Sequence, residues 1–286
     1  MIDIKRNSKK EPIKATGIRV KSSSCYSPNQ KEDFKISRGK FNNFLSCQRC
    51  FYLDRVKGLD APSTPGWSLN ETTDILLKKE FDFCRQRQIP HRIFIENKLT
   101  NLVPFDHPDI DAWRDSLHKG LKIRYKNSNI ILTGGIDDVW QDKNTKKLII
   151  VDYKSQAKLG RLDKKDYLKD PYHEGYKIQM DFYAYLLSRM GFNIDKISFF
   201  LVCNAKRDAD LFNKKIKFDE FLIPYHWDTN WIERKIDEMI NLINKDQIPE
   251  ANPSCKNCAY ADQYAKSIYK ELDNEIIELQ GSLFNY

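Results

Sequence analysis

The chain has 286 residues, of which 41% are hydrophobic and 31% are charged, and its formal net charge is +8 at pH 7. This length can bury one substantial core with a small appended subdomain, and no apolar run approaches the length of a membrane span. The basic surplus favours a polyanionic partner without requiring one.

The compartment follows from the start of the chain and from its cysteines. The first ten residues contain no apolar stretch of the secretory type, so we expect an intracellular, cytoplasmic protein without a membrane partner. An odd number of cysteines, seven, also argues against a disulfide framework.

The N-terminal part is expected to be a tail followed by a helix. Residues 1–35 are rich in Lys, Ser, Asn and Pro and show no hydrophobic period, which predicts a basic disordered tail. Ser37 then caps a helix that extends to about Leu59. Cys47 and Cys50 fall near the C-terminal half of this helix.

A turn-rich break at residues 61–66 precedes a second, longer helix. Its apolar positions predict a helix over residues 69–88. Residues 89–129 show no sustained period, and we expect an irregular connection that contains one short helix.

Two β-branched runs predict a β-hairpin. The runs are residues 130–140 and 146–155, and the polar turn between them is residues 141–145. Each run contains an acidic residue, so the hairpin is the first place to look for chemistry.

The hairpin brings charged side chains together. Asp152 and Lys154 are two apart and leave the same face of their strand, whereas Tyr153 leaves the other. Antiparallel pairing would place Asp137 opposite Asp152, and two carboxylates that close repel each other unless a divalent cation binds them. Lys154 would then stabilise an anionic transition state or orient a water. Alone, the Asp-x-Lys pattern is more often an exposed ion pair on an edge strand.

The C-terminal half continues as an α/β pattern. Residues 156–171 are expected to form a basic loop with the charge to bind a phosphate backbone, with a solvated loop as the alternative. Residues 172–190 are predicted to be helical. Gln179 and Tyr183 lie one turn apart on that helix, so both can point into one groove, although such a pair alone is common in a core or at its rim. Two more strands and a helix are expected at residues 196–203, 215–223 and 228–244. The prediction is a mixed central sheet flanked by helices.

Two Cys-x-x-Cys pairs form a quartet. The pairs are Cys47 with Cys50, and Cys255 with Cys258 in a tight knuckle. A shared tetrahedral site of four sulfurs suits Zn²⁺ or an iron-sulfur cluster, and four reduced structural thiols are the alternative. Such a site would fasten the N-terminal helix to the knuckle. The domain is expected to span residues 36–262, followed by an amphipathic helix over 263–286 that packs on the core or on a partner.

Three motifs together resemble those of the PD-(D/E)XK nuclease superfamily, in its RecB-like branch. They are Gly134-x-x-Asp137, Asp152-x-Lys154 and Gln179-x-x-x-Tyr183. The resemblance implies a restriction-endonuclease-like core that hydrolyses phosphodiester bonds with Mg²⁺ or Mn²⁺. It also implies the roles of single residues: Asp137, Asp152 and the backbone carbonyl of Tyr153 as metal ligands, Lys154 as the catalytic cation, and Gln179 and Tyr183 as residues that line the nucleic-acid channel.

The chain departs from that branch at three places. A histidine that completes the metal site is replaced by Asp74, with Glu80 as the second candidate, although Asp74 is nearly as well explained as a first-turn acid favoured by the helix dipole. The opening Cys-Pro-x-x-Phe-Tyr-Leu helix has Gln48 in place of proline. Members with a [4Fe-4S] cluster use one N-terminal and three C-terminal cysteines, whereas this chain has two and two, so the metal stays open between iron-sulfur and zinc.

The resulting hypothesis is a metal-dependent DNA nuclease in DNA repair, recombination, or phage- or CRISPR-type processing. Its partners would be single- or double-stranded DNA and a helicase or another DNA-processing protein. A catalytically silent nuclease fold that binds nucleic acid or acts as a scaffold subunit is the alternative. A zinc-dependent interaction protein would leave the acid pair unexplained.

Overall fold

The computed structural model describes residues 4–20, 22–62, 66–160 and 162–283, and the chain forms two compact units. The first, called the sheet unit, comprises Lys31–Asn42 and Ser63–Asp237. The second, called the cysteine unit, comprises Ile2–Gln30, Asn43–Pro62 and Glu238–Tyr286. Both β-sheets belong to the sheet unit, and both Cys-x-x-Cys pairs belong to the cysteine unit.

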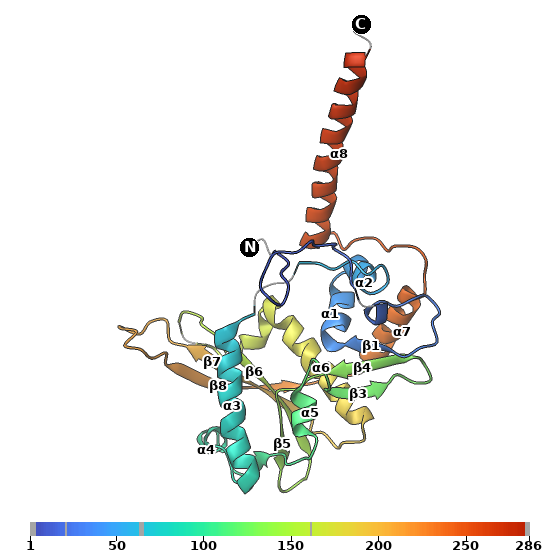
Figure 1. The fold of residues 1–286 in the computed structure, drawn as a ribbon. Coiled ribbons are helices and arrows are strands. Elements are labelled where there is room, and N and C mark those ends of the chain that lie inside the picture. The colour runs from blue at the N-terminus through green and yellow to red at the C-terminus, as the bar shows by residue number, and fades with distance from the viewer. Residues whose placement is uncertain (1–3, 21, 63–65, 161, 284–286) are drawn as a thin grey trace. The chain divides into compact units, whose positions relative to one another are not determined.

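A five-stranded mixed sheet is the centre of the sheet unit (Figure 1). In spatial order its strands are β2 (Leu102–Pro104), β5 (Asp138–Asp142), β6 (Leu148–Gln156), β7 (Ile197–Ala205) and β8 (Phe218–His226). Strands β6 and β7 are parallel, and the other neighbours are antiparallel. A parallel pair needs a crossover connection, and α6 (Glu174–Arg189) supplies it. The predicted mixed sheet flanked by helices is therefore confirmed.

Helices cover both faces of this sheet. Besides α6, the helices that lie entirely within the sheet unit are α3 (Ser68–Arg87), α4 (Arg92–Glu96) and α5 (Ile110–Arg114). Helix α3 packs against β6, as does α6. Tyr153 joins the core next to α3, where Phe81 stacks on it and on Trp140 at centroid distances of 5.7 and 5.4 Å. Asp152, the neighbour of Tyr153 on β6, contacts α6 instead, as the alternation of a strand requires.

A second, smaller sheet divides the first predicted strand of the hairpin. Its order is β1 (Phe34–Ser37), β4 (Ile130–Gly134) and β3 (Leu121–Arg124). The prediction of one strand over residues 130–140 is wrong, because β4 and β5 belong to different sheets. The break has a steric cause: a Cβ on Gly135 would lie 2.4 Å from Ser116 Cβ, and the Ile136 N–H donates to the Trp113 carbonyl at 3.2 Å. The backbone therefore passes directly against the segment that ends α5.

The region between α3 and β4 is more regular than predicted. Helices α4 and α5 and strands β2 and β3 all lie within residues 89–129. The two strands have three and four residues, which is too short for an alternating pattern to show in the sequence. They form because β5 and β4 offer them hydrogen-bonding edges.

Two helices take the place of the single N-terminal helix that was expected. They are α1 (Arg38–Ser46) and α2 (Gln48–Arg55). Ser37 caps the first, since its Oγ accepts from the Lys40 N–H at 3.3 Å. Cys47 is extended, with φ −158° and ψ 107°, and stands at the N-cap of α2. Cys47 and Cys50 therefore lie at the start of a second helix, not in the C-terminal half of a longer one.

Part of the segment predicted as a tail makes defined contacts. In the cysteine unit Ile18 bridges to Leu59, and Tyr26 is buried with its hydroxyl 3.0 Å from Asn244 Oδ1. In the sheet unit Phe34 begins β1. Isolated apolar residues of this kind show no period, so the sequence did not indicate them.

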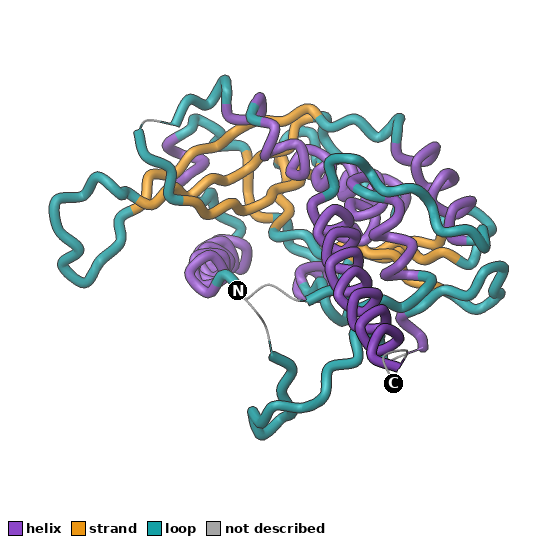
Figure 2. The backbone as a smooth tube through the Cα atoms, turned by 90° about the horizontal axis from the view of Figure 1, so that it is seen from above, coloured by secondary structure: helices purple, strands orange, loops and turns teal. Residues whose placement is uncertain are grey.

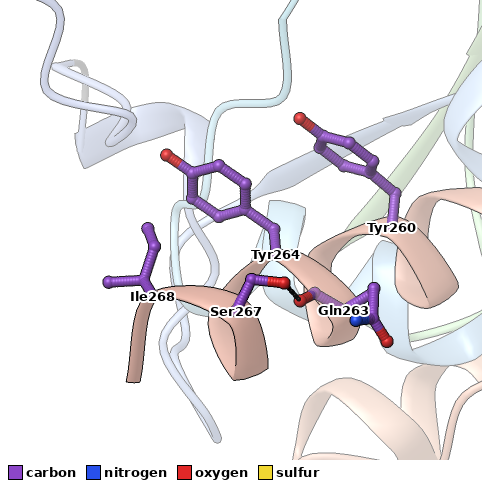
Figure 3. Close-up of a pocket in the computed structure, with 5 residues that line it drawn as sticks. All are labelled: Tyr260, Gln263, Tyr264, Ser267 and Ile268. Carbon is purple, nitrogen blue, oxygen red and sulfur yellow. Dashed lines mark hydrogen bonds between the residues drawn. The ribbon is translucent and has the colours of Figure 1, made fainter. Parts of the chain in front are cut away.

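The cysteine unit also contains the end of α7 (Ile232–Ile243) and all of α8 (Lys256–Leu283). Helix α8 begins within the second cysteine pair and continues without a break past residue 263, where an amphipathic helix was predicted. Tyr260, Tyr264 and Ile268 form an exposed stripe on it, and the two rings stack with centroids 5.9 Å apart (Figure 3). No helix in the described part of the chain combines the length and apolar character needed to cross a membrane.

Candidate active site

Strand pairing brings the two predicted acids together. In the β5–β6 ladder Asp138 is opposite Val151, so the antiparallel register continues with Asp137 opposite Asp152. The Tyr153 N–H donates to Asp137 Oδ2 at 2.7 Å. The main chain of β6 therefore holds the side chain of Asp137 next to Asp152.

Asp152 is completely buried on the α6 side of β6. Its Oδ1 accepts a hydrogen bond from Gln179 Nε2 at 2.7 Å. Its Oδ2 forms an ion pair with Lys154 Nζ, but no described residue gives that oxygen a hydrogen bond of proper geometry. The ammonium group of Lys154 is therefore the charge partner of this buried carboxylate.

Lys154 is held as a cation by its neighbours. Its Nζ donates to Gln179 Oε1 at 3.3 Å and lies 4.5 Å from the ring centroid of Tyr176. Burial opposes the charge, but attraction to Asp152 and Asp137 outweighs it, so the pKa of Lys154 is raised. The amine is therefore protonated at neutral pH and acts as a positive charge, not as a base.

The pKa of Asp137 is also raised, which for a carboxyl group disfavours the charged form. Burial and the nearby charge of Asp152 raise its pKa from 3.8 to about 7, against the opposing effects of Lys154, Lys78 and the Tyr153 N–H. Asp137 therefore holds a proton more tightly than an isolated aspartate does.

The groups around the pair fit a hard divalent cation. Carboxylates and main-chain carbonyls are the oxygen ligands that Mg²⁺ and Mn²⁺ prefer. The β5–β6 ladder ends at Asp138 and Val151, so the Tyr153 carbonyl, which points to the β5 side like its N–H, has no strand partner there. Together with the carboxylates of Asp137 and Asp152, this carbonyl supplies the oxygen types that such an ion prefers.

Glu80, one of the two candidates for a further ligand, is occupied elsewhere. Its Oε2 lies 3.0 Å from His91 Nε2 and 3.1 Å from Arg92 Nη2. The imidazole of His91 is buried and stacks on Phe81 at 4.0 Å. Glu80 therefore belongs to a structural cluster at the far end of α3.

Asp74, the other candidate, lies within electrostatic reach of the acid pair. Burial raises its pKa and the charge of Asp137 adds to this, while Lys78, 2.7 Å away, lowers it. Among the described residues, the oxygens of Asp74, Asp137 and Asp152 do not all lie within 4.8 Å of one another. Asp74 is thus an outer member of the acidic group.

Gln179 and Tyr183 connect the motifs to one another. Gln179 Nε2 donates to Tyr183 Oη at 3.0 Å as well as to Asp152. A Cβ on Gly134 would lie 2.9 Å from Tyr183 Cε1, so glycine is needed where the tyrosine ring packs on β4. Gln179 is 8% exposed and Tyr183 2%; their predicted place along a nucleic-acid channel stays a prediction.

A buried network that the sequence analysis missed lies on the other face of the sheet. The carboxylate of Asp138 is fully buried and accepts from Arg85, from Arg114 at 3.0 Å and from the Tyr153 hydroxyl at 2.8 Å. Arg114 Nε also donates to the Asp137 carbonyl at 3.1 Å. The network therefore holds the backbone of Asp137 from behind. The available signal was the adjacent Asp-Asp pair, since the second acid of such a pair on a strand faces the opposite side.

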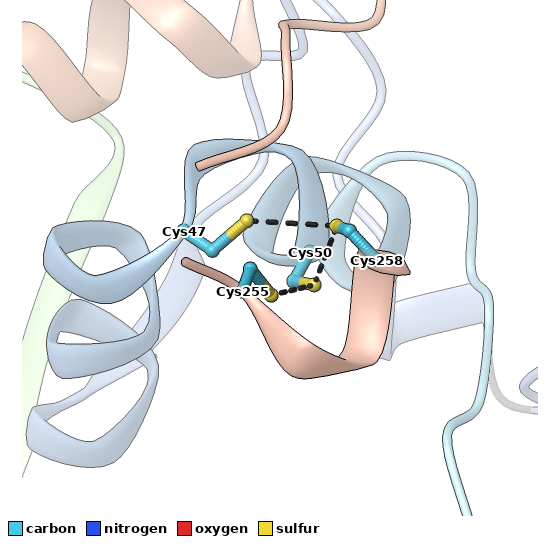
Figure 4. A group of neighbouring side chains, drawn as sticks. All are labelled: Cys47, Cys50, Cys255 and Cys258. Carbon is cyan, nitrogen blue, oxygen red and sulfur yellow. Dashed lines mark hydrogen bonds between the residues drawn. The ribbon is translucent and has the colours of Figure 1, made fainter. Parts of the chain in front are cut away.

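The four predicted cysteines meet within the cysteine unit (Figure 4). The Sγ–Sγ distances are 3.7 Å for Cys47–Cys258, 3.5 Å for Cys50–Cys255 and 3.4 Å for Cys50–Cys258. All four sulfurs lie within 4.8 Å of one another, and no other such group of three or more metal-binding side chains occurs in the described part of the chain.

The start of α2 also favours a thiolate in this cluster. Burial opposes ionisation of Cys47, but the backbone N–H groups of Cys50 and Asn252 lower its pKa to about 7. Free N–H groups in the first turn of a helix stabilise negative charge in this way. Burial, by contrast, raises the pKa of Cys50 and that of Cys258, so it is the geometry of the quartet that matches a metal site.

The helix-flanked mixed sheet with an acid pair and a lysine on β6 defines an α/β protein of the restriction-endonuclease-like class. A sequence model of the PD-(D/E)XK nuclease superfamily matches residues 83–263, which is more than half of the chain. The chain therefore belongs to the PD-(D/E)XK nuclease superfamily, and membership implies a hydrolase that acts on nucleic acids. The match includes the three motifs but not Asp74.

No curated protein matches this chain. A crystal structure of a protein from Eubacterium rectale, described as a candidate exonuclease, aligns with 85% of this chain and 94% of that chain, at 14% identity and a TM-score of 0.39. The assignment therefore depends on the superfamily match and on the site.

Proposed function

We propose that this chain is a metal-dependent deoxyribonuclease of the RecB-like branch that acts in DNA repair, recombination, or phage- or CRISPR-type DNA processing. The observation that carries the proposal is the convergence of Asp137, Asp152 and Lys154 at one point of β6, where the buried Asp152 pairs with Lys154 and the Tyr153 N–H holds Asp137 beside it. The substrate is single- or double-stranded DNA, and a helicase or another DNA-processing protein is the candidate partner.

Each residue of the site has a separate task. Asp137, Asp152 and the Tyr153 carbonyl hold Mg²⁺ or Mn²⁺, and Asp74 supports them from α3. A divalent ion bound there supplies a Lewis acid for phosphate oxygens. Lys154 places a fixed positive charge where negative charge develops on the phosphate.

Gln179 sets the geometry between these groups. One amide binds both the carboxylate of Asp152 and the amine of Lys154, so the two cannot move independently. Because the groups are positioned before substrate arrives, little reorganisation is needed during the reaction.

The test compares Lys154→Ala with the wild type on labelled single-stranded DNA, double-stranded DNA and RNA, with Mg²⁺, Mn²⁺ or EDTA. We expect metal-dependent cleavage of DNA that the substitution slows by about 100-fold or more, while DNA binding persists. The control is Lys146→Ala, in the β5–β6 turn at the opposite end of the strands, which should cleave normally. A wild type that binds DNA but never cuts with any divalent metal would support the silent, DNA-binding alternative.

For the cysteine quartet we propose one bound Zn²⁺. Four sulfurs arranged tetrahedrally at about 2.3 Å from zinc lie about 3.8 Å apart, close to the 3.4–3.7 Å between the paired sulfurs. In a [4Fe-4S] cluster each sulfur binds a different iron, which requires wider spacing. The distances thus favour zinc among the two metals that the sequence left open.

Elemental analysis of anaerobically purified protein tests this choice. We expect one zinc per chain and no absorbance near about 400 nm, where iron-sulfur clusters absorb. Stoichiometric iron with that absorbance would contradict the zinc proposal, and the absence of both metals would remove the site.

A further inference from the structure

The connection between β7 and β8, residues 206–217, is a long hairpin that the active site does not use, and it is called the arm here. It extends away from the larger sheet (Figure 2), and all of its residues are exposed. The Lys206 N–H donates to the Lys217 carbonyl at its base at 2.9 Å. The Lys215 N–H donates to the Phe212 carbonyl at its tip at 2.8 Å, so the arm has a defined turn at its end.

The tip turn is built with some strain. Asn213 and Lys214, its two central residues, have φ values of 38° and 57°, which corresponds to the type I′ turn of tight hairpins. Positive φ is tolerated by asparagine but unfavourable for lysine. The turn places the side chains of Phe212 and Lys215 at its two ends, next to each other across the hairpin.

The side chains of the arm combine exposed apolar groups, one of them an aromatic ring, with lysines that form no ion pair among the described residues. Leu211 is 79% exposed and Phe212 71%, although burial of such side chains is favourable. Lys214, Lys215 and Lys217 form no ion pair with any described acidic residue. Over its whole length the arm has five basic and two acidic residues. Lysines that bind phosphates beside an aromatic ring that stacks on a base are the two elements of a single-strand-binding surface.

The arm begins at the end of the sheet where the site lies. Lys154 is paired with Val202 in the parallel β6–β7 ladder, and β7 ends at Ala205. Arg207 Nη1 donates to the Ala157 carbonyl at 3.4 Å, so the base of the arm is next to the basic loop that follows β6. At about 3.3 Å per residue, Phe212 lies at most about 33 Å along the chain from Val202.

We propose that the arm binds an unpaired nucleic-acid strand that continues out of the active site. Lys214 and Lys215 contact its phosphates, and Phe212 stacks on one of its bases. The inference rests on the proposed nuclease function and deepens it, because it assigns a preference for substrates with a single-stranded segment long enough to reach the tip.

The experiment measures binding of fluorescent oligo-dT strands of about 4 to about 16 nucleotides by anisotropy, in EDTA and in the Lys154→Ala background, so that the strands are not cut during the measurement. Phe212→Ala and the double variant Lys214→Ala/Lys215→Ala test the arm. The matched control is Lys143→Ala/Lys146→Ala, in the exposed β5–β6 turn at the opposite end of the sheet. All changes are on exposed positions, and equal melting temperatures confirm that the variants fold.

We expect each arm variant to weaken binding of the longest strands by about 10-fold and to leave the shortest strands unaffected. The double lysine variant should also lower the slope of log K against log salt by about 1.4. In the catalytically intact protein, Phe212→Ala should slow cleavage of long strands but not of short ones.

The two proposals fail in different ways. If the wild type cuts DNA but the arm variants bind long strands as the control does, the arm inference is wrong and the nuclease proposal stands. Equal losses on short and long strands would also overturn the arm inference, because they show no dependence on reach. If the wild type neither binds nor cuts any nucleic acid, both proposals fall.

Discussion

Asp137 and Asp138 are adjacent, yet the same substitution should change stability in opposite directions at the two positions. Asp137→Asn removes a carboxylate that Asp152 repels, whereas Asp138→Asn removes one that two buried arginines require. The pair therefore tests whether the first acid is poised for a cation and the second is structural.

The magnitude at Asp137 follows from its pKa, which is raised from 3.8 to about 7. A difference of about three units corresponds to about 4 kcal/mol. Because the folded pKa is above the unfolded one, the folded state holds this proton more tightly. The favourable contribution is complete below about pH 4 and is lost as the pH rises through about 7. Above that pH the ionised Asp137 therefore destabilises the metal-free protein, and asparagine does not.

At Asp138 the expected change is a loss of about 3 kcal/mol, because Arg85 and Arg114 are left in the interior with less negative charge. Asp82 also pairs with both arginines, so they keep one carboxylate partner in the variant. The expected loss of stability is therefore at the lower end of the range for buried ion pairs that lose one partner.

Thermal unfolding of the sheet unit in EDTA at about pH 5 and about pH 8 distinguishes these cases. Asp137→Asn should melt close to the wild type at the lower pH and on the order of 10 °C above it at the higher pH, at roughly 2 to 4 °C per kcal/mol. Asp138→Asn should melt below the wild type at both. Mg²⁺ or Mn²⁺ should stabilise the wild type but not Asp137→Asn. The reasoning is refuted if Asp137→Asn melts below the wild type at about pH 8 in EDTA.

Three further predictions concern the outer ligand, the cysteines and the glycines. Asp74→Ala should raise the Mg²⁺ concentration for half-maximal cleavage about 10-fold, whereas Glu80→Ala should leave a metal titration of cleavage unchanged; equal effects would reject the distinction. Cys50→Ser should lower zinc content in elemental analysis and reduce the melting temperature of the cysteine unit, and unchanged zinc would count against the quartet. Gly135→Ala should lower the free energy of unfolding in urea by about 3 kcal/mol and Gly134→Ala by about 1, because the new methyl group would meet backbone at the first position and the edge of a ring at the second; the reverse order would contradict the packing.

Sequence reasoning recovered the elements whose own residues determine them. The helix predicted over residues 69–88 corresponds closely to α3, and the strand that carries Asp152 and Lys154 is β6. Both are long and have a clear period or a β-branched run. The break at Gly135 could not be predicted in this way, because it depends on Ser116, which approaches that glycine only in the folded chain.

In the site, too, the sequence predicted contacts within one strand or helix but not contacts between distant elements. The spacing within one strand or one helix turn placed Lys154 beside Asp152 and Gln179 beside Tyr183, and the structure has these contacts. The network behind the sheet was missed because Arg114 reaches Asp138 from a separate short helix. No local pattern specifies a contact between residues that distant elements bring together.

The cysteine quartet has a consequence for biosynthesis. Cys258 is made 208 residues after Cys50, so at about 5–20 residues per second a ribosome needs roughly 10–40 s between them. During that interval the first two thiols have no partners with which to complete a four-sulfur site, while the intervening nuclease sequence emerges. A polypeptide whose synthesis stops within that sequence lacks Cys255 and Cys258, and therefore half of the proposed zinc site. Under that proposal, metal content reports that translation has passed residue 258.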